Sequence, residues 1–481
     1  MGREIGDISL FIDNEWVRDT DRRLEVINPA DQQRIGTVAV AQSRHLEAAL
    51  ASAQQGFEVW RRTDAVSRGA ILMRAASLVR ERAPQTARLL TLEQGKPFRH
   101  ALTEVLDAAE IMEWYASEAG RITGTLLPPR KSGARQSVFA EPIGPVAAFT
   151  PWNFPVLLTS RKISAALAAG CSCILKPSEE TPAAVATLAD ALRDAGLPPG
   201  VLNVVYGDPS SIAAHLIPSP TIRKVSLTGS IAAGRAVAAL AAQGPKPCTM
   251  ELGGHAPVFV LPDADIDFSA KLAAVSKTYN AGQVCTSPTR FFVHSSVFES
   301  FAKSLAGNLE RTRIGDGMDA DSRMGPLANQ RRLDAMDELT RDALDKGADL
   351  LTGGKRIGNS GYFWQPTLLA NVTADMAVTA TEPFGPIATL ERYDELDEAV
   401  AISNRSTVGL AAYVFSRSGD IAARIADGLD VGVVGINSFE LANPEAPFSG
   451  VKSSGYGYEG GSWGLEGYLH YKYVNQLNRN G

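Results

Sequence analysis

The chain has 481 residues, 45 % hydrophobic and 21 % charged, which are proportions of a globular protein large enough for more than one core. Its formal net charge is −6 with both signs interspersed, which argues against nucleic acid or an anionic membrane as the main partner. No N-terminal signal pattern or apolar run of about 20 residues is present, and four cysteines are too few for a disulfide framework, so a cytoplasmic protein is predicted.

Two segments, 124–142 and 465–481, fit neither of the α/β patterns described below. The first is polar and punctuated by glycine and proline, and the second forms the tail of the chain. Both are predicted to be edge strands. Because an exposed strand edge is usually covered by pairing, they predict a homo-oligomer. Two ordinary surface hairpins are the alternative.

Between residues 143 and 261, short apolar runs alternate with alanine-rich helical segments. Thr181-Pro182 is typical of a helix N-cap followed by proline at the first helical position, and Gly170 and Gly196 are typical of helix ends. Alternating strands and helices imply a parallel sheet covered on both faces, an architecture suited to dinucleotides. The predicted strands are 146–150, 173–175, 202–205, 225–228 and 257–260.

A second α/β pattern follows from about residue 286 to 450. Helices are predicted at 298–309 and 329–346, and strands at 413–415 and 431–434. The two patterns together predict an α/β protein with two lobes and a cleft between them.

Cys285 follows a glycine-containing turn and is flanked by small and polar residues. A lone cysteine is most often a small buried hydrophobe, which is our interpretation of Cys171, Cys173 and Cys248. The residues around Cys285 do not by themselves favour a catalytic cysteine over a small buried hydrophobe. The six histidines are isolated, and no histidine or cysteine cluster has metal-ligand spacing, so no metal is predicted.

Two other residues make a nucleophilic role for Cys285 more convincing. Glu251 precedes a glycine pair, where the backbone can approach a ligand closely. Asn153 lies where a strand should end and a helix begin, and its amide could donate to a developing oxyanion, an interaction worth about 3 kcal/mol. A helix-capping role for Asn153 is the alternative.

Two segments point to a dinucleotide. Lys176, Ser178 and Glu179 directly follow a strand, and Gly229-Ser230 opens a helix whose N-terminal amides are suited to a pyrophosphate. The Gly-x-Gly-x-x-Gly fingerprint is absent, so the spacing alone is a weak signal.

Six segments in order along the chain resemble the signature set of the aldehyde dehydrogenase superfamily. The resemblance implies a Rossmann-like cofactor domain (1–123 and 143–253), an α/β catalytic domain (254–452) and a small β oligomerisation arm (124–142 and 465–481), assembled as dimers or tetramers. The segments are FTPWNFP (149–155), KPSEETP (176–182), LTGS (227–230), MELGG (250–254), GQVCT (282–286) and EPFGP (382–386).

The resemblance also implies residue roles: Cys285 as nucleophile, Glu251 as general base and Asn153 as oxyanion donor. The expected cofactor-binding residues are Thr150, Pro151, Trp152, Lys176, Ser178, Glu179, Gly229, Ser230, Leu252, Glu382 and Phe384. The expected substrate-binding residues are Phe154, Leu157, Arg161, Thr286 and Phe448.

The implied reaction begins with attack of the Cys285 thiolate on an aldehyde and passes through a thiohemiacetal to a thioester. Glu251 then activates water to release the carboxylic acid. Relatives that pass the acyl group to coenzyme A commonly lack this glutamate, so its presence favours hydrolysis over that competing reaction. A non-catalytic binding protein on the same scaffold is a further alternative, which the intact trio of Asn153, Glu251 and Cys285 disfavours.

Cofactor and substrate preferences depend on single residues. Glu179 would accept hydrogen bonds from ribose hydroxyls and repel a 2′-phosphate, so NAD is predicted as the preferred cofactor with NADP as a second. Arg161 suggests a semialdehyde carrying a carboxylate, because a guanidinium pairs bidentately with that group. Its alternative position is the solvent face of its helix.

Two positions depart from the succinate-semialdehyde pattern. Tyr279 stands where some of those enzymes have a second arginine, and Ser287 stands where some have a second cysteine. Aromatic or medium-chain aldehydes therefore remain alternative substrates, with Phe154, Leu157 and Phe448 as lining residues.

Overall fold

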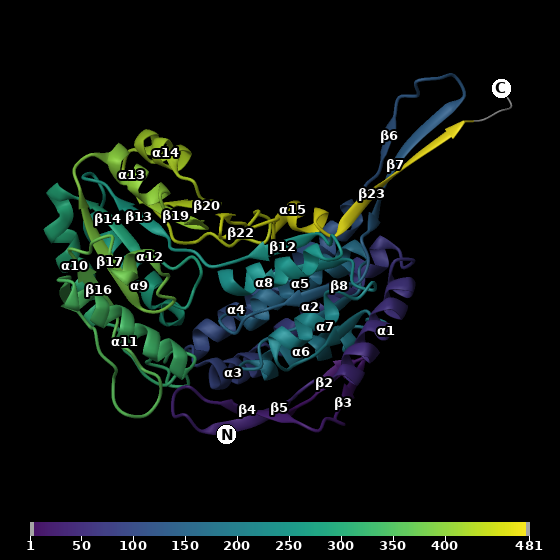
Figure 1. Cartoon of the computed structure of the whole chain (residues 1–481), viewed down its shortest axis with the longest axis horizontal. Helices are drawn as coiled ribbons and strands as arrows, with labels where there is room; N and C mark the ends of the chain where they lie inside the picture. The colour runs from purple at the N-terminus through teal and green to yellow at the C-terminus, as the bar shows by residue number, and fades with distance from the viewer. Residues whose placement is uncertain (1–3, 478–481) are drawn as a thin grey trace.

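A computed structural model describes residues 4–477. Two α/β lobes lie side by side, and a narrow β arm projects from the lobe that holds the N-terminal half of the chain (Figure 1). The predicted α/β fold is therefore confirmed, with one parallel-sheet core in each lobe.

The sheet of the first lobe has eight strands in the order β22-β12-β11-β8-β9-β10-β2-β3. Its five central strands are parallel, and four of them coincide with predicted runs; the fifth, β12, was not predicted. The parallel strands are β8 (Val146–Phe149), β9 (Cys173–Lys176), β10 (Leu202–Val204), β11 (Lys224–Thr228) and β12 (Cys248–Glu251). The antiparallel edge strands are β2 (Leu10–Ile12), β3 (Glu15–Val17) and β22 (Gly455–Tyr456).

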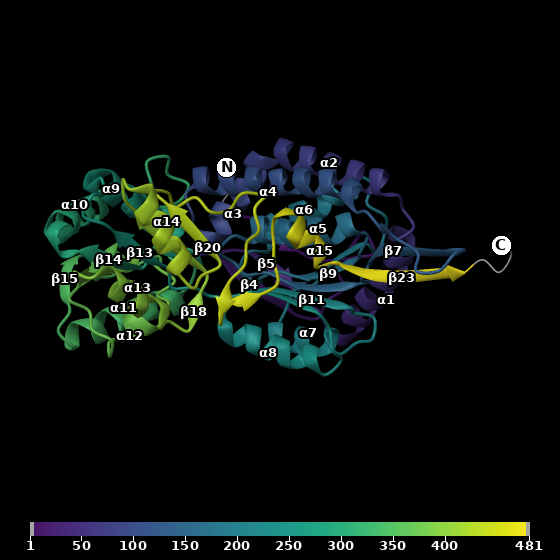
Figure 2. The same cartoon turned by 90° about the horizontal axis from the view of Figure 1, so that it is seen from above.

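Helices cover both faces of this sheet. Figure 2 shows α2 and α4 to α6 on one side and α7 and α8 on the other. The small sheet β1-β5-β4 adjoins this lobe near the N-terminus. The helices are α1 (Ser43–Trp60), α2 (Ala65–Glu81), α3 (Ala83–Gln94), α4 (Phe98–Glu118), α5 (Pro155–Ala169), α6 (Pro182–Asp194), α7 (Pro209–Leu216) and α8 (Ile231–Ala242), and the strands are β1 (Gly6–Ile8), β4 (Arg23–Ile27) and β5 (Arg34–Ala39).

The second lobe is built on a seven-stranded sheet in the order β15-β16-β17-β14-β13-β19-β20. The run 257–260 was expected to continue the first sheet, but it forms β13 at the centre of this one. The strands are β13 (Pro257–Val260), β14 (Arg290–His294), β15 (Asp349–Thr352), β16 (Thr367–Ala370), β17 (Ile387–Tyr393), β19 (Ala411–Phe415) and β20 (Val433–Ile436). The main helices are α9 (Ile266–Thr278), α10 (Phe298–Glu310), α11 (Gln330–Asp345), α13 (Leu396–Asn404) and α14 (Gly419–Gly428).

Strand register brings the candidate segments of the first lobe to one edge of its sheet. Phe149 of β8 pairs with Lys176 of β9, and Thr228 of β11 pairs with Glu251 of β12. Since parallel strands end at the same edge, the loops after these strands open side by side, where doubly wound sheets bind ligands.

Carboxylates from distant elements cap two of the helices that begin at this edge, α5 and α6. Helices α5 and α6 both start with proline, as predicted for α6. Thr181 does not cap α6 with its side chain; instead Glu93 accepts hydrogen bonds from the amides of Ala183 and Ala184 at 2.8 and 2.9 Å. The Glu93 side chain therefore replaces the local hydroxyl as the acceptor for the first amides of α6.

The projecting arm contains β6 (Thr125–Leu127), β7 (Ala134–Pro142) and β23 (Leu469–Leu477). β7 pairs antiparallel with both neighbours, so the two segments predicted as edge strands pair with each other within one chain. Residues 478–481, which the arm was predicted to include, lie outside the described residues. Exposed apolar side chains remain on the arm: Leu126, Leu127, Phe139, Tyr471, Tyr473, Val474 and Leu477.

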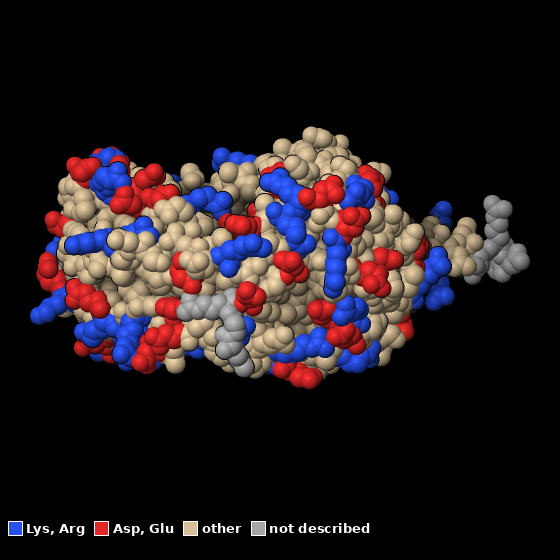
Figure 3. Space-filling model, turned by 90° about the horizontal axis from the view of Figure 1, so that it is seen from below, with Lys and Arg blue, Asp and Glu red and all other residues tan. Residues whose placement is uncertain are grey.

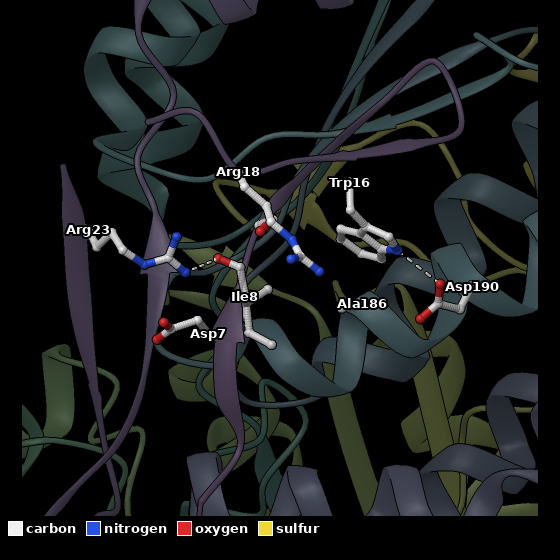
Figure 4. A pocket seen from close by; sticks show the side chains of 8 residues that line it. Asp7, Ile8, Trp16, Arg18, Arg23, Ala186 and Asp190 are labelled. Atoms are coloured by element: carbon white, nitrogen blue, oxygen red, sulfur yellow. Dashed lines mark hydrogen bonds between the residues drawn. The ribbon is translucent and has the colours of Figure 1, made fainter. Parts of the chain in front are cut away.

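The outer surface of the described chain carries charges of both signs (Figure 3) and a cavity. No helix within residues 4–477 has the length and apolar character needed to span a bilayer. Positive and negative side chains are interspersed over the face in Figure 3. A surface cavity of about 530 Å³ lies between the N-terminal strands and α6, where the indole of Trp16 donates to Asp190 at 3.0 Å (Figure 4). None of its lining residues belongs to the candidate site.

Candidate active site

The loop that carries Cys285 has an unusual backbone. Asn280, Ala281 and Gly282 all adopt left-handed conformations, with φ of 49°, 54° and 70°. A side chain at Gly282 would place its Cβ 2.2 Å from the carbonyl oxygen of Gly385, so glycine is required there. Strained backbone of this kind persists where the surroundings hold it in place, and it often marks functional sites. The loop thereby fixes Cys285 against the 382–386 segment.

The thiol of Cys285 is held in its neutral form. Burial raises its pKa to about 12, and the negative charges of Glu382 and Glu251 add to the shift. The Arg161 guanidinium opposes them and lowers the pKa. Deprotonation of Cys285 therefore needs a base or a positive charge brought by a ligand. Of the other cysteines, Cys171 and Cys173 are buried as interpreted, whereas Cys248, like Cys285 itself, is only partly buried.

Glu251 is a buried carboxyl group without a protein partner. It ends β12, is 3 % exposed, and neither carboxyl oxygen makes a hydrogen bond. Burial raises its pKa well above the usual range, and the nearby charge of Glu459 raises it further. Native proteins seldom leave buried polar atoms unsatisfied, so the carboxyl is available to a water molecule or substrate.

A buried ion pair that the sequence did not reveal lies beside Glu251. Lys162 of α5 hydrogen-bonds to Glu459 and, at 3.1 Å, to Ser226. Its positive charge lowers the pKa of Glu251, whereas Glu459 raises it. The only sequence signal was a lysine next to Arg161 in an otherwise apolar helix.

Asn153 faces residues 280–285, the loop that carries Cys285 and is called the nucleophile loop below. Its Nδ2 donates to the carbonyl oxygen of Gln283 at 3.1 Å, and its Oδ1 is buried without a partner. The helix-capping alternative is wrong, because the first amides of α5 are capped by Glu104 of α4, at 3.0 and 3.3 Å. An amide NH₂ has two hydrogens, so one remains free to donate to a ligand near Cys285.

Arg161 is buried in the same region as Glu251 and Asn153. It is 4 % exposed, so its placement on a solvent face is wrong. Its guanidinium carbon lies 5.2 Å from the centroid of the Phe448 ring, and Nε is buried without a partner. Its charge lowers the pKa values of Cys285 and Glu251, which places the cation close to both.

Aromatic rings lie around Tyr279, the position at which some succinate-semialdehyde dehydrogenases have a second arginine. Tyr279 stacks on Phe154 with centroids 5.9 Å apart and an interplanar angle of 21°. The ring centroid of Tyr279 also lies 4.5 Å from that of His100. Of the other expected substrate residues, Leu157 is half-buried, and the carbonyl of Thr286 accepts a 2.7 Å hydrogen bond from the hydroxyl of Tyr413.

The expected adenosine-binding residues meet at the carboxyl edge of β9. Lys176 and Glu179 form an ion pair at 2.6 Å, and the Ser178 hydroxyl accepts from the amide of Glu180. After β11, which is separated from β9 by β8, Ser230 caps α8 by accepting from the amide of Ala233 at 3.2 Å. These groups offer a carboxylate for hydroxyls and helix amides for an anion, which fits a dinucleotide.

The next expected cofactor residues lie directly after three strands of the first lobe, β8, β11 and β12. Gly229 donates its amide to the carbonyl of Glu251 at 3.0 Å, and Leu252 packs so tightly on α8 that a Cβ at Gly234 would lie 2.5 Å from it. Thr150, half-buried Pro151 and Trp152 follow β8, and the amide of Thr150 bonds to the carbonyl of Lys176 at 3.1 Å.

The 382–386 segment of the second lobe reaches these residues. The Phe384 ring meets Trp152 edge to face at 5.5 Å, and Phe384 has a positive φ of 44°. Burial raises the pKa of Glu382 to about 8. A Cβ at Gly253 would lie 2.5 Å from the Glu382 carboxylate, so only glycine allows this approach. Both lobes thus contribute residues around Cys285.

Comparison with known proteins identifies the family. The aldehyde dehydrogenase family model matches residues 16–474, and the chain belongs to that family. It is 44 % identical to 4-(hydroxymethyl)benzenesulfonate dehydrogenase TsaD1 of Comamonas testosteroni, over 97 % of this chain and 98 % of that protein. It is 39 % identical to succinate-semialdehyde dehydrogenase [NADP(+)] GabD of Escherichia coli K12, over 98 % and 99 %.

Comparison with solved structures also supports membership of this family. A succinate-semialdehyde dehydrogenase from Burkholderia pseudomallei superimposes with a TM-score of 0.96 at 41 % identity, covering 98 % of each chain. The predictions of an aldehyde-oxidising enzyme and of NAD or NADP as its cofactor are thereby confirmed. The roles assigned to individual residues and the domain boundaries stay predictions.

Proposed function

We propose that this protein oxidises an aldehyde with an anionic group at its far end to the carboxylic acid, using Cys285 as nucleophile. The observation that carries the proposal is the convergence of a half-buried thiol, an unpartnered carboxyl group and an unpartnered guanidinium nitrogen, from Cys285, Glu251 and Arg161. Relatives whose names specify succinate semialdehyde or a benzenesulfonate support an acidic substrate.

The reaction begins when Cys285 loses its proton and attacks the aldehyde carbon. A carboxylate whose pKa is raised, as at Glu251, is a stronger base than an ordinary one and suits this proton transfer. Negative charge develops on the former carbonyl oxygen, where the second hydrogen of the Asn153 amide stabilises it. The backbone amide of Cys285 is a further donor.

The expected cofactor residues fit NAD or NADP, since they combine the N-terminus of α8 with the Glu179 carboxylate after β9 and the Glu382 carboxyl group near Cys285. When bound, the cofactor would accept a hydride from the thiohemiacetal, which thereby becomes a thioester on Cys285. Glu251 first releases the proton taken from Cys285 to solvent; it then removes a proton from water, which attacks the thioester and releases the acid. The Glu179 carboxylate favours the free ribose hydroxyls of NAD over the 2′-phosphate of NADP.

Arg161 supplies the anchor for the anionic end of the substrate. A guanidinium forms two parallel hydrogen bonds with a carboxylate or sulfonate, and burial strengthens them. The substrate carries this anion opposite the aldehyde, as succinate semialdehyde does.

An aromatic aldehyde bearing an acidic group is the second candidate substrate. The specific observation in its favour is the 44 % identity to a dehydrogenase whose name specifies 4-(hydroxymethyl)benzenesulfonate, a ring with an anionic group, and the Phe154–Tyr279 pair would border such a ring with its edges. The Tyr279 side chain also leaves only Arg161 as a cationic anchor among the expected substrate residues.

The test is NADH formation from a panel of aldehydes by wild type and Cys285→Ala. The panel contains succinate semialdehyde, 4-formylbenzenesulfonate, benzaldehyde and hexanal, each with NAD and NADP. The proposal expects acidic aldehydes to give the highest kcat/KM and Cys285→Ala to be inactive. Equal rates with neutral aldehydes would reject the anionic substrate, and activity of Cys285→Ala would reject the nucleophile. Product appearing only with added coenzyme A would reject hydrolysis.

We further propose that the protein is cytoplasmic and that its arm joins copies of the chain into a dimer or tetramer. The exposed apolar side chains on β6, β7 and β23 support the assembly, since such side chains are usually covered by a partner.

A further inference from the structure

A fully buried ion pair beneath the candidate site has no part in the reaction described above. Lys96 follows α3 and Glu104 lies on α4, and both side chains are 0 % exposed. Burying two charges is costly unless each makes further hydrogen bonds. Their additional partners therefore indicate what the pair does.

Those partners are all in the segment that carries Asn153. Lys96 Nζ donates to the backbone carbonyl oxygen of Asn153 at 2.6 Å and lies 3.9 Å from the centroid of the Phe154 ring. Glu104 accepts hydrogen bonds from the backbone amides of Val156 and Leu157. One buried pair thus holds the carbonyl of Asn153 and the start of the helix that follows it.

Asn280 reaches the same carbonyl from the nucleophile loop. Its Nδ2 donates to the Asn153 carbonyl oxygen at 3.0 Å and to the Gln283 carbonyl oxygen at 3.3 Å. The Asn153 side chain in turn donates to Gln283 at 3.1 Å. The result is a closed ring of hydrogen bonds between Asn153, Asn280 and Gln283, two residues before Cys285.

The helix does not supply this restraint itself. Its backbone ladder begins with the bond from Leu158 to the carbonyl of Phe154, one residue after Asn153. The carbonyl of Asn153 is instead held by Lys96 and Asn280. Asn280 is 1 % exposed and keeps a left-handed backbone, which asparagine tolerates better than most residues.

We propose that Lys96 and Asn280 are positioning residues that fix the Asn153 amide so that its free hydrogen points at the oxygen of the Cys285 adduct. The inference rests on the proposed function. With one amide hydrogen committed to Gln283, the direction of the other follows from the placement of the Asn153 backbone. A misplacement of about 1 Å at a catalytic group can cost about 100-fold in rate.

The test is a double-mutant cycle on kcat, using Asn153→Ala and Asn280→Gly. Glycine accepts the left-handed backbone and removes only the side chain. If Asn280 acts through Asn153, Asn280→Gly lowers kcat by about 10- to 100-fold in wild type but by less than about 2-fold in Asn153→Ala. KM for the aldehyde changes by less than about 3-fold in both backgrounds, because substrate anchoring is intact.

A second pair of variants separates positioning from loss of stability. Asn371→Gly is the matched control: Asn371 is exposed, has φ of 55° and loses one side-chain hydrogen bond to Asp349. It should leave kcat unchanged. Asn280→Asp keeps the shape but replaces the donor with an acceptor facing two carbonyl oxygens, and it should lower kcat at least as much as Asn280→Gly. Lys96→Met is expected to lower kcat, again non-additively with Asn153→Ala.

The measurement is the rate of NADH formation with the panel aldehyde that wild type oxidises fastest, alongside thermal unfolding of each variant. Non-additive losses in kcat support the proposal. Equal fold losses of Asn280→Gly in both backgrounds, or full activity of Asn280→Asp, would overturn it. Failure of the proposed function is distinguishable, because it appears as activity in Cys285→Ala, whatever the outcome of the cycle.

Discussion

The guanidinium of Arg161 lies over the ring of Phe448, with 5.2 Å between the guanidinium carbon and the ring centroid. The two residues come from α5 and from a segment almost 300 positions later in the chain, whose backbone pairs with Glu459 in both directions. The ring stabilises the buried cation without occupying its hydrogen-bond donors, so Nε stays available to a ligand.

Replacing Arg161 should therefore change substrate preference more than catalysis. Arg161→Met is expected to raise KM for succinate semialdehyde by about 10- to 100-fold, since hydrogen bonds to a charged group contribute about 1.5 to 3 kcal/mol. KM for benzaldehyde should change by less than about 3-fold. Arg161→Lys keeps the charge and should recover part of the affinity. Steady-state kinetics with both aldehydes measure the difference, and a similar loss for both would contradict an anion anchor.

The raised pKa of Cys285 predicts how its reactivity depends on pH. Below a pKa of about 12 the thiol is neutral, so its thiolate fraction should increase about tenfold per pH unit. Alkylation of cofactor-free protein by iodoacetamide should therefore keep rising from pH 7 to 10. Peptide mass mapping would distinguish Cys285 from Cys248. A plateau near pH 9, as for an ordinary thiol, would show that burial does not govern the thiol.

Glu179 should control the choice between NAD and NADP. Its carboxylate is paired with Lys176 at 2.6 Å, and its charge would repel a 2′-phosphate bound beside it. Glu179→Gln removes that charge and frees the ammonium group, so kcat/KM for NADP should rise relative to NAD by about 10-fold or more. Initial rates at varied cofactor concentrations give the ratio. An unchanged ratio would place cofactor selection elsewhere.

The arm should carry the assembly. Val474→Asp on β23 and Leu126→Asp on β6 put charges on side chains that are 41 % and 69 % exposed in one chain. Light scattering is expected to show a smaller species for both variants than for wild type. Val66→Asp on α2, a position 79 % exposed, is the control and should leave the mass unchanged. If the wild-type protein is itself a monomer, the proposal that the arm joins copies of the chain is wrong.

The features that the sequence predicted well are those with local signals. The runs at β8, β9, β10 and β11 are short and apolar, and the proline at the start of α6 marks its first turn. The run 257–260 was placed in the wrong sheet because hydrophobicity identifies a strand but not its neighbours. Its pairing with β14 and β19 depends on segments 30 to 160 residues away.

Contacts between distant residues were the part that could not be predicted. Thr181 looked like a helix cap, yet Glu93, about 90 residues earlier, takes that role. Arg161 is buried because α4 packs on α5, which the pattern of α5 alone does not reveal. Lys96, Glu104 and Asn280 were missed for the same reason, since nothing in their local sequence links them to Asn153.

The central claim is that Cys285 forms a thioester that Glu251 helps to hydrolyse, and the most direct test is to trap it. Glu251→Gln keeps the shape of the buried side chain but removes the base, so steady-state turnover should fall by about 100- to 10,000-fold. Because Glu251 also takes the proton of Cys285, acylation should be slower in this variant, and hydrolysis slower still. Incubated with NAD and the preferred aldehyde until NADH release levels off, it should release about one NADH per site and gain the mass of one acyl group on Cys285, as measured by intact-protein and peptide mass spectrometry. Full turnover of Glu251→Gln, or an acyl group on any residue other than Cys285, would contradict the account.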